Sequence, residues 1–243
     1  MAVMNDFYSP LQNAALWLGA WLHGFEPFEA VSDALQALNL YPHDGSLISD
    51  LKQLRAVSAD VPKGEPALLL VLSGPGDPLP LQNPEALTAA HDSQGAIIIP
   101  SGPQGYNVVV LDSTRWKWFS VPGPLPAMAV VMPGEADQLM SAAVNQAAAA
   151  IDQMSQPLSN VASPRLRVGS LTDFYETPGL PSSVPPRAAQ LIARADRATA
   201  IVAATVAHDH VFDPQLLSLS RHIRHARMSA VAYALAEWGR LAG

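Results

Sequence analysis

Four histidines near the C-terminus have the residue type and spacing of a candidate metal site. His208 and His210 lie two residues apart, and His222 and His225 follow at a spacing that places them near one another on a helix. Imidazole nitrogens are common metal ligands, so a metal-dependent enzyme is one hypothesis. Cations beside such a site oppose binding of another cation, which favours a solvated basic face instead. Three arginines are interleaved with the two later histidines: Arg221, Arg224 and Arg227.

The loop Ser73–Pro78 follows an apolar run, where phosphate-binding loops often occur. Two of its residues are prolines, which lack N–H donors, and Asp77 adds a negative charge. No Lys-Ser or Lys-Thr pair follows it, so the loop is interpreted as a structural turn. His91 and several carboxylates also lie near expected strand ends, but no spacing ties them together. The chain has no G-x-S-x-G motif, and no catalytic residue is assigned.

The chain contains no cysteine. This excludes disulfides, thiolate zinc sites, iron–sulfur clusters and cysteine nucleophiles. No cofactor is expected from the sequence.

The segment Arg115–Phe119 alternates strictly and places Trp116 and Trp118 on one side of an expected strand. Two neighbouring indoles can form a binding surface for a partner peptide or for a sugar. The interpretation that we favour is a half-buried strand whose tryptophans lie in the core.

Hydrophobic periodicity and capping signals predict the elements that must position these residues. The short loops between the later strands favour an antiparallel meander. The predicted fold class is α+β, with a mainly antiparallel sheet, N-terminal helices and an alanine-rich helical C-terminal region. Helices are expected over 10–23, 27–38, from 46, over 83–91, 135–156, 186–207 and 214–241, and strands over 67–72, 96–99, 106–111, 115–121 and 127–132.

The last expected helix carries apolar residues on two sides. Such a helix is either sandwiched within the domain or contributes to a subunit interface, so a homodimer through the C-terminal helices is a hypothesis. Arg227 and Glu237 fall inside the apolar sector, and each is expected to have a partner on another element. We treat both, with Trp116 and Trp118, as candidate partner-binding residues.

Composition limits the classes of protein. Hydrophobic residues make up 49% of the 243 residues, which is enough for a buried core. Residues 1–164 hold five basic and fifteen acidic residues, a net −10, whereas residues 165–243 hold nine and six, a net +3. This balance disfavours a nucleic-acid binder.

No segment has the pattern of a secretory signal or the length of a membrane span, so a cytoplasmic protein is expected. Residues 1–156 are predicted to form a body with the sheet, and residues 157–243 a helical region packed on it; a single domain is the alternative.

The order of motifs between about Leu47 and Met132 resembles the actinobacterial EspG family, the cytosolic chaperones of type VII secretion. The likeness rests on SLISDLKQLRAV, GPGDPLPL, PEALTAAHDSQGAIII, YNVVVLD, RWKWFSV and PGPLPAMAVVMPG. It implies a non-enzymatic protein that binds a helical secretion substrate and shields its apolar tip. The second strand meander expected in that family has no counterpart after Gln156.

The sequence therefore predicts a non-catalytic, cytosolic protein-binding or chaperone-like module. Two alternatives stay open: a small-molecule or metal-dependent enzyme that uses the C-terminal histidines, and a structural homodimer.

Overall fold

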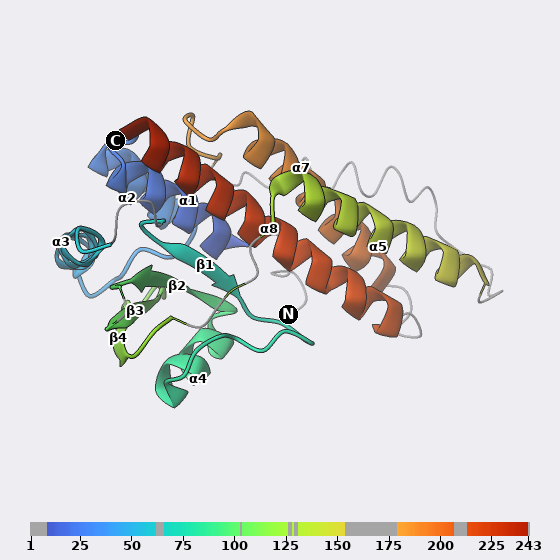
Figure 1. The fold of residues 1–243 in the computed structure, drawn as a ribbon, viewed down its shortest axis with the longest axis horizontal. Coiled ribbons are helices and arrows are strands. Elements are labelled where there is room, and N and C mark those ends of the chain that lie inside the picture. Colours follow the sequence, from blue (N-terminus) through green and yellow to red (C-terminus); the bar gives the residue numbers. More distant parts are fainter. Residues whose placement is uncertain are drawn as a thin grey trace.

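The computed structural model describes residues 9–61, 66–102, 104–125, 128, 131–153, 179–206 and 213–242. These residues form an α+β fold in which a sheet and its covering helices are joined to a group of three long helices (Figure 1). Among the helices described, none has the length and apolar character needed to cross a bilayer.

Three helices at the N-terminal end confirm the sequence expectations. The first begins where expected because the Ser9 hydroxyl accepts a hydrogen bond from the Gln12 backbone N–H at 3.3 Å. Pro10 fits the first helical turn, where its missing N–H costs nothing. The bounds are α1 Pro10–Leu22, α2 Phe28–Ala37 and α3 Leu47–Ser58.

A four-stranded antiparallel meander follows, as the short connecting loops predict. Its order is β1-β2-β3-β4, so each strand pairs with its neighbour in sequence. One helix, α4, interrupts the connection between β1 and β2, and Asn83 caps it through two backbone N–H groups. The bounds are β1 Leu69–Leu72, α4 Pro84–Asp92, β2 Gly95–Pro100, β3 Gly105–Val110 and β4 Lys117–Pro122. The strand expected over 127–132 lies largely outside the described residues.

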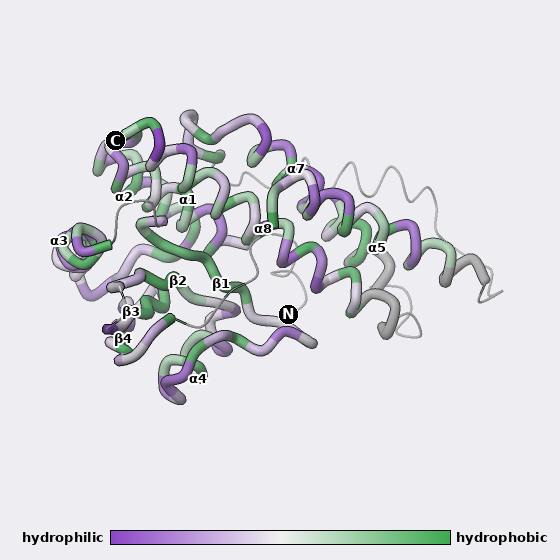
Figure 2. The backbone as a smooth tube through the Cα atoms, viewed as in Figure 1, coloured by the Kyte–Doolittle hydropathy of each residue, from purple (hydrophilic) through white to green (hydrophobic). Residues whose placement is uncertain are grey.

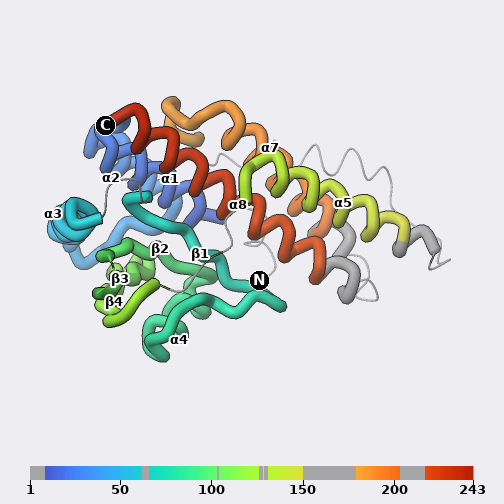
Figure 3. The backbone as a smooth tube through the Cα atoms, in the orientation of Figure 1, coloured from blue at the N-terminus to red at the C-terminus, as the bar shows by residue number. Residues whose placement is uncertain are grey.

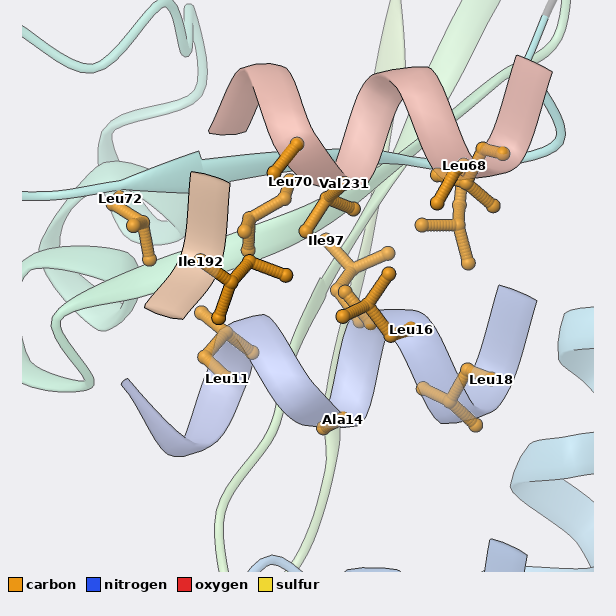
Figure 4. Packing of buried hydrophobic residues seen from close by; sticks show 14 of the residues in the cluster. Leu11, Ala14, Leu16, Leu18, Leu68, Leu70, Leu72, Ile97, Ile192 and Val231 are labelled. Atoms are coloured by element: carbon orange, nitrogen blue, oxygen red, sulfur yellow. The ribbon is translucent and has the colours of Figure 1, made fainter. Parts of the chain in front are cut away.

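Both faces of the sheet are apolar because helices cover both. On one face, Leu70, Ile97 and Val109 belong to the main core with residues of α1, α7 and α8. Figure 4 shows Ile97 beside Leu16 of α1. On the other face, the alternate residues of the strands form a second, smaller core with α4. The near-continuous apolar strands in the sequence follow from this double coverage.

Three long helices complete the described chain and confirm the alanine-rich helical region. Helix α8 packs against α5 and α7 along one side and against α1 and β1 along another. Part of the group extends away from the sheet, and the tube in Figure 3 shows α8 running back toward the N-terminal helices. Hydrophobic and hydrophilic residues alternate along these helices (Figure 2). Their bounds are α5 Pro133–Gln153, α7 Pro186–Val206 and α8 Asp213–Ala242.

From Leu219 onward, both apolar sides of α8 carry residues that are buried against other parts of the chain. Ile223 and Ala226 are buried on one side, and Val231 and Leu235 are buried on the other. Gly19 of α1 permits the second contact, because a Cβ at Gly19 would lie 2.4 Å from a methyl carbon of Leu235. The helix is therefore sandwiched, which was one of the two predicted outcomes.

Helix α8 joins the sheet to the long helices. Sequence patterning places α5 with the body that ends at residue 156, but α5 packs chiefly against α8 and also contacts α7. Helix α8 in turn contacts α1 and β1, so it is the element shared by the two parts of the fold.

Candidate functional site

The densest group of charged side chains lies where α8 passes the loop after β1. Asp77 forms ion pairs with Arg221 at 2.7 Å and with Arg224 at 2.7 Å, and its carboxylate lies 3.4 Å from Nε2 of His225. We call Asp77, Arg221, Arg224 and His225 the Asp77 cluster. It connects the sheet to the long helices across about 150 residues of sequence.

The loop itself is built to receive Arg224. Gly76 has a φ of +81°, and the Asp77 N–H donates to the Gly74 carbonyl at 3.2 Å, which closes a tight turn. Arg224 then donates to the Pro75 carbonyl at 2.8 Å. A Cβ at Gly74 would lie 2.3 Å from the guanidinium and would displace it from its present position. The structural interpretation of this loop is therefore confirmed.

Electrostatics keep Asp77 ionised. Burial alone would raise the pKa of Asp77, but the hydrogen bond from Arg224 and the charges of Arg224, His225 and Arg221 outweigh it, and the pKa is lowered. A carboxylate with a lowered pKa that is already paired with two guanidinium groups is a poor general acid or base at neutral pH. The Asp77 cluster is therefore suited to holding elements together.

Two of the four candidate metal ligands can be placed. Burial, followed by the charges of His225 and Arg221, lowers the pKa of His222, while Asp77 acts in the opposite direction. His225 faces Asp77, with Arg221 and Arg224 on the same carboxylate. Within the described ranges, no three His, Asp or Glu side chains are grouped as a metal site requires. The other two candidates, His208 and His210, lie outside the described residues.

Ser73 and His91 form a pair that sequence reasoning did not find. The Ser73 hydroxyl lies 3.0 Å from Nδ1 of His91. An imidazole at this distance can accept a proton from a serine hydroxyl. Among described residues, no carboxylate contacts His91 to orient it. In the sequence, only the positions of Ser73 directly after β1 and of His91 in the last turn of α4 signal the pair, since 18 residues separate them.

Trp116 and Trp118 lie as the half-buried interpretation predicts. Trp116 is 2% exposed, and its indole N–H donates to the Leu40 carbonyl at 2.9 Å. Trp118 donates to the carboxylate of Asp50 at 2.9 Å. Trp118 therefore joins β4 to α3, and Trp116, directly before β4, joins the chain to the segment between α2 and α3.

Arg227 confirms the expectation of a partner on another element. It is 3% exposed and forms an ion pair with Asp196 of α7 at 2.7 Å. It also donates to Gln12 of α1 at 3.1 Å and to Thr199 of α7 at 3.1 Å. Burial raises the pKa of Asp196, and the charge and hydrogen bond of Arg227 oppose that rise. This network joins α1, α7 and α8.

The same expectation is wrong for Glu237. Its partner is Arg240 on the same helix, at 2.8 Å. Glu237 remains 29% exposed, so water and a neighbour one turn away suffice for its charge. A role of Trp116, Trp118, Arg227 or Glu237 in binding another protein stays a prediction.

Comparison with known proteins gives a family. Residues 12–130 match the family model of the Rv1486c-like protein, N-terminal domain, and residues 134–228 match that of the Rv1486c-like protein, C-terminal domain. The two models follow one another in order and together span most of the chain. Their boundary falls at the start of α5, so the second model holds nearly all of α5, all of α7 and the first part of α8, up to residue 228. No curated protein and no solved structure matches the chain.

Proposed function

We propose that this chain, which belongs to the Rv1486c-like proteins, is a non-catalytic, chaperone-like protein-binding module of the cytoplasm. One observation carries the proposal: the charged clusters link the chain's own elements. The Asp77 cluster ties α8 to the sheet, and Arg227 ties α8 to α1 and α7. Side chains used in this way support a rigid scaffold for binding more readily than a reaction centre.

The long helices supply the surface that a partner would contact. Leu139 of α5, Ile201 of α7 and Leu217 of α8 are each 43–47% exposed. Large apolar side chains that remain accessible on rigid helices can contribute to protein interfaces. The resemblance to the EspG chaperones makes a helical secretion substrate the partner class that we propose.

The test is affinity purification of the full chain from its native host after brief crosslinking. We expect one partner to be enriched reproducibly and to co-elute with the chain at a defined stoichiometry. Light scattering of the chain alone distinguishes the structural homodimer, because a stable dimer without a second protein would contradict the proposal. Failure to enrich any protein would contradict it as well.

A second candidate function is a serine-dependent hydrolase, and the Ser73–His91 distance of 3.0 Å favours it. His91 would accept the Ser73 proton while the hydroxyl oxygen attacks an ester carbonyl, and would pass that proton to the departing alcohol as the ester C–O bond breaks. Water would then hydrolyse the acyl-serine to release the acid and restore Ser73. A fluorophosphonate probe would then label the chain, and Ser73→Ala would abolish the labelling. If the wild-type chain is not labelled, this candidate is wrong.

A further inference from the structure

An exposed row of arginines runs along α7. Arg187, Arg194 and Arg197 follow at spacings of seven and three residues, which places them on one face of the helix. All three are exposed, and the side chain of Arg194 retains 58% of its accessible surface. Ile201, one turn beyond Arg197, is 43% exposed on the same face. We call these four residues the α7 arginine stripe.

Acidic neighbours neutralise only part of the stripe. Arg194 pairs with Asp137 of α5. Asp196, the acidic residue of α7, is 37% exposed and pairs with the buried Arg227. Arg187 and Arg197 form no ion pair with the residues that the structure describes. The stripe therefore keeps a positive surplus on a chain whose net charge is −7.

We propose that the α7 arginine stripe docks an acidic helical segment of a partner protein. Guanidinium groups match carboxylates in charge and in hydrogen-bond geometry. Arg187 and Arg197 are separated by about 15 Å along the axis at 1.5 Å per residue. A partner helix lying along α7 meets them with Glu or Asp at the same spacings, and its apolar residue at the end covers Ile201. This inference rests on the proposed protein-binding function.

The charge distribution selects a protein partner over nucleic acid. A long polyanion along α7 would meet the field of residues 1–164, whose net charge is −10. A short acidic helix meets only the local surplus of the stripe, because charges beyond about 8–10 Å are screened at physiological salt.

The first experiment is a fluorescence-anisotropy titration of the full chain with a labelled synthetic helix. The probe is an alanine-rich peptide with three glutamates at spacings of seven and three residues, and its control has glutamines there. We expect salt-sensitive binding of the glutamate peptide alone. The double variant Arg187→Gln, Arg197→Gln should raise Kd by about 2- to 30-fold, the range for losing two exposed ion pairs. The matched control, Arg115→Gln, Lys117→Gln, removes two exposed cations from another surface and should bind as the wild type does.

Three outcomes would overturn the inference: no binding of the glutamate peptide, equal loss in both double variants, or tighter binding of a labelled single-stranded oligonucleotide. The crosslinking purification repeated with the Arg187→Gln, Arg197→Gln chain separates this inference from the proposed function. If the wild-type partner is recovered undiminished, the stripe is wrong as the docking site while protein binding stands. If the wild-type chain recovers no partner, the proposed function itself has failed.

Discussion

Replacing Asp77 by Asn should destabilise the fold, because the substitution leaves Arg224 without its counter-charge. The side chains of Asp77 and Arg224 are only 11% and 13% exposed, and breaking such a pair leaves a nearly buried cation uncompensated. Fully buried pairs cost about 3–5 kcal/mol when one partner is removed, and the residual exposure reduces this to about 2–4 kcal/mol. Arg221, at 54% exposed, adds at most about 1 kcal/mol. With about 2–4 °C per kcal/mol for a chain of this size, Tm should fall by roughly 4–16 °C.

The pH dependence identifies the cause of the loss. Because the pKa of Asp77 is lowered in the folded chain, its contribution is fully present above the unfolded pKa of about 3.9. That contribution is lost as the pH falls through the folded pKa. Denaturation followed by circular dichroism should therefore show a gap between wild type and Asp77→Asn at pH 7 that narrows in strong acid. Asp92→Asn, which removes an exposed carboxylate of α4, is the control and should behave as wild type. A gap below about 0.5 kcal/mol at pH 7, or one unchanged in acid, would refute the reasoning.

Three further predictions test the contacts that build the fold by chemical denaturation. Gly74→Ala should cost about 1–3 kcal/mol because its Cβ would overlap Arg224, whereas Gly134→Ala, with nothing within 4 Å, should be near neutral; equal effects would contradict the close approach. Arg227→Met should destabilise by about 1–3 kcal/mol, because Gln12 and Thr199 lose a hydrogen-bond donor while Asp196, at 37% exposed, is still reached by water, and an unchanged stability would show that the network contributes little. Trp118→Phe removes the N–H that reaches Asp50 and should cost about 1 kcal/mol, while an unchanged stability would mean that water replaces it.

Local patterns predicted the helices and strands well because their signals are local. Ser9 before Pro10 and Asn83 before Pro84 start helices where the capping side chains accept backbone hydrogen bonds. The short loops of the meander allow only neighbouring antiparallel strands. The alternation around Trp118 likewise predicts which face of β4 packs against the main core.

The pairings between distant elements could not be predicted from one sequence. Arg224 and Asp77 are separated by 147 residues, and Arg227 and Gln12 by 215. The spacing of Arg221, Arg224 and Arg227 shows a basic turn of helix, but it does not reveal which cation enters the core. The position of Arg227 in an apolar sector of the helix predicts a buried side chain with a partner on another element. The structure confirms both, since Arg227 is buried and forms an ion pair with Asp196. Glu237 also falls in the apolar sector, but it lies near the end of α8 and pairs with Arg240 of the same helix.

Site-specific photocrosslinking in the native host tests the central claim of protein binding most directly. A photoreactive residue replaces Ala193, an exposed position on α7, and in a second chain it replaces Lys52, an exposed position on α3. Binding through the long helices predicts one discrete crosslinked protein from position 193 and none from position 52. The absence of any crosslink from position 193, or the same set of crosslinks from both positions, would contradict it.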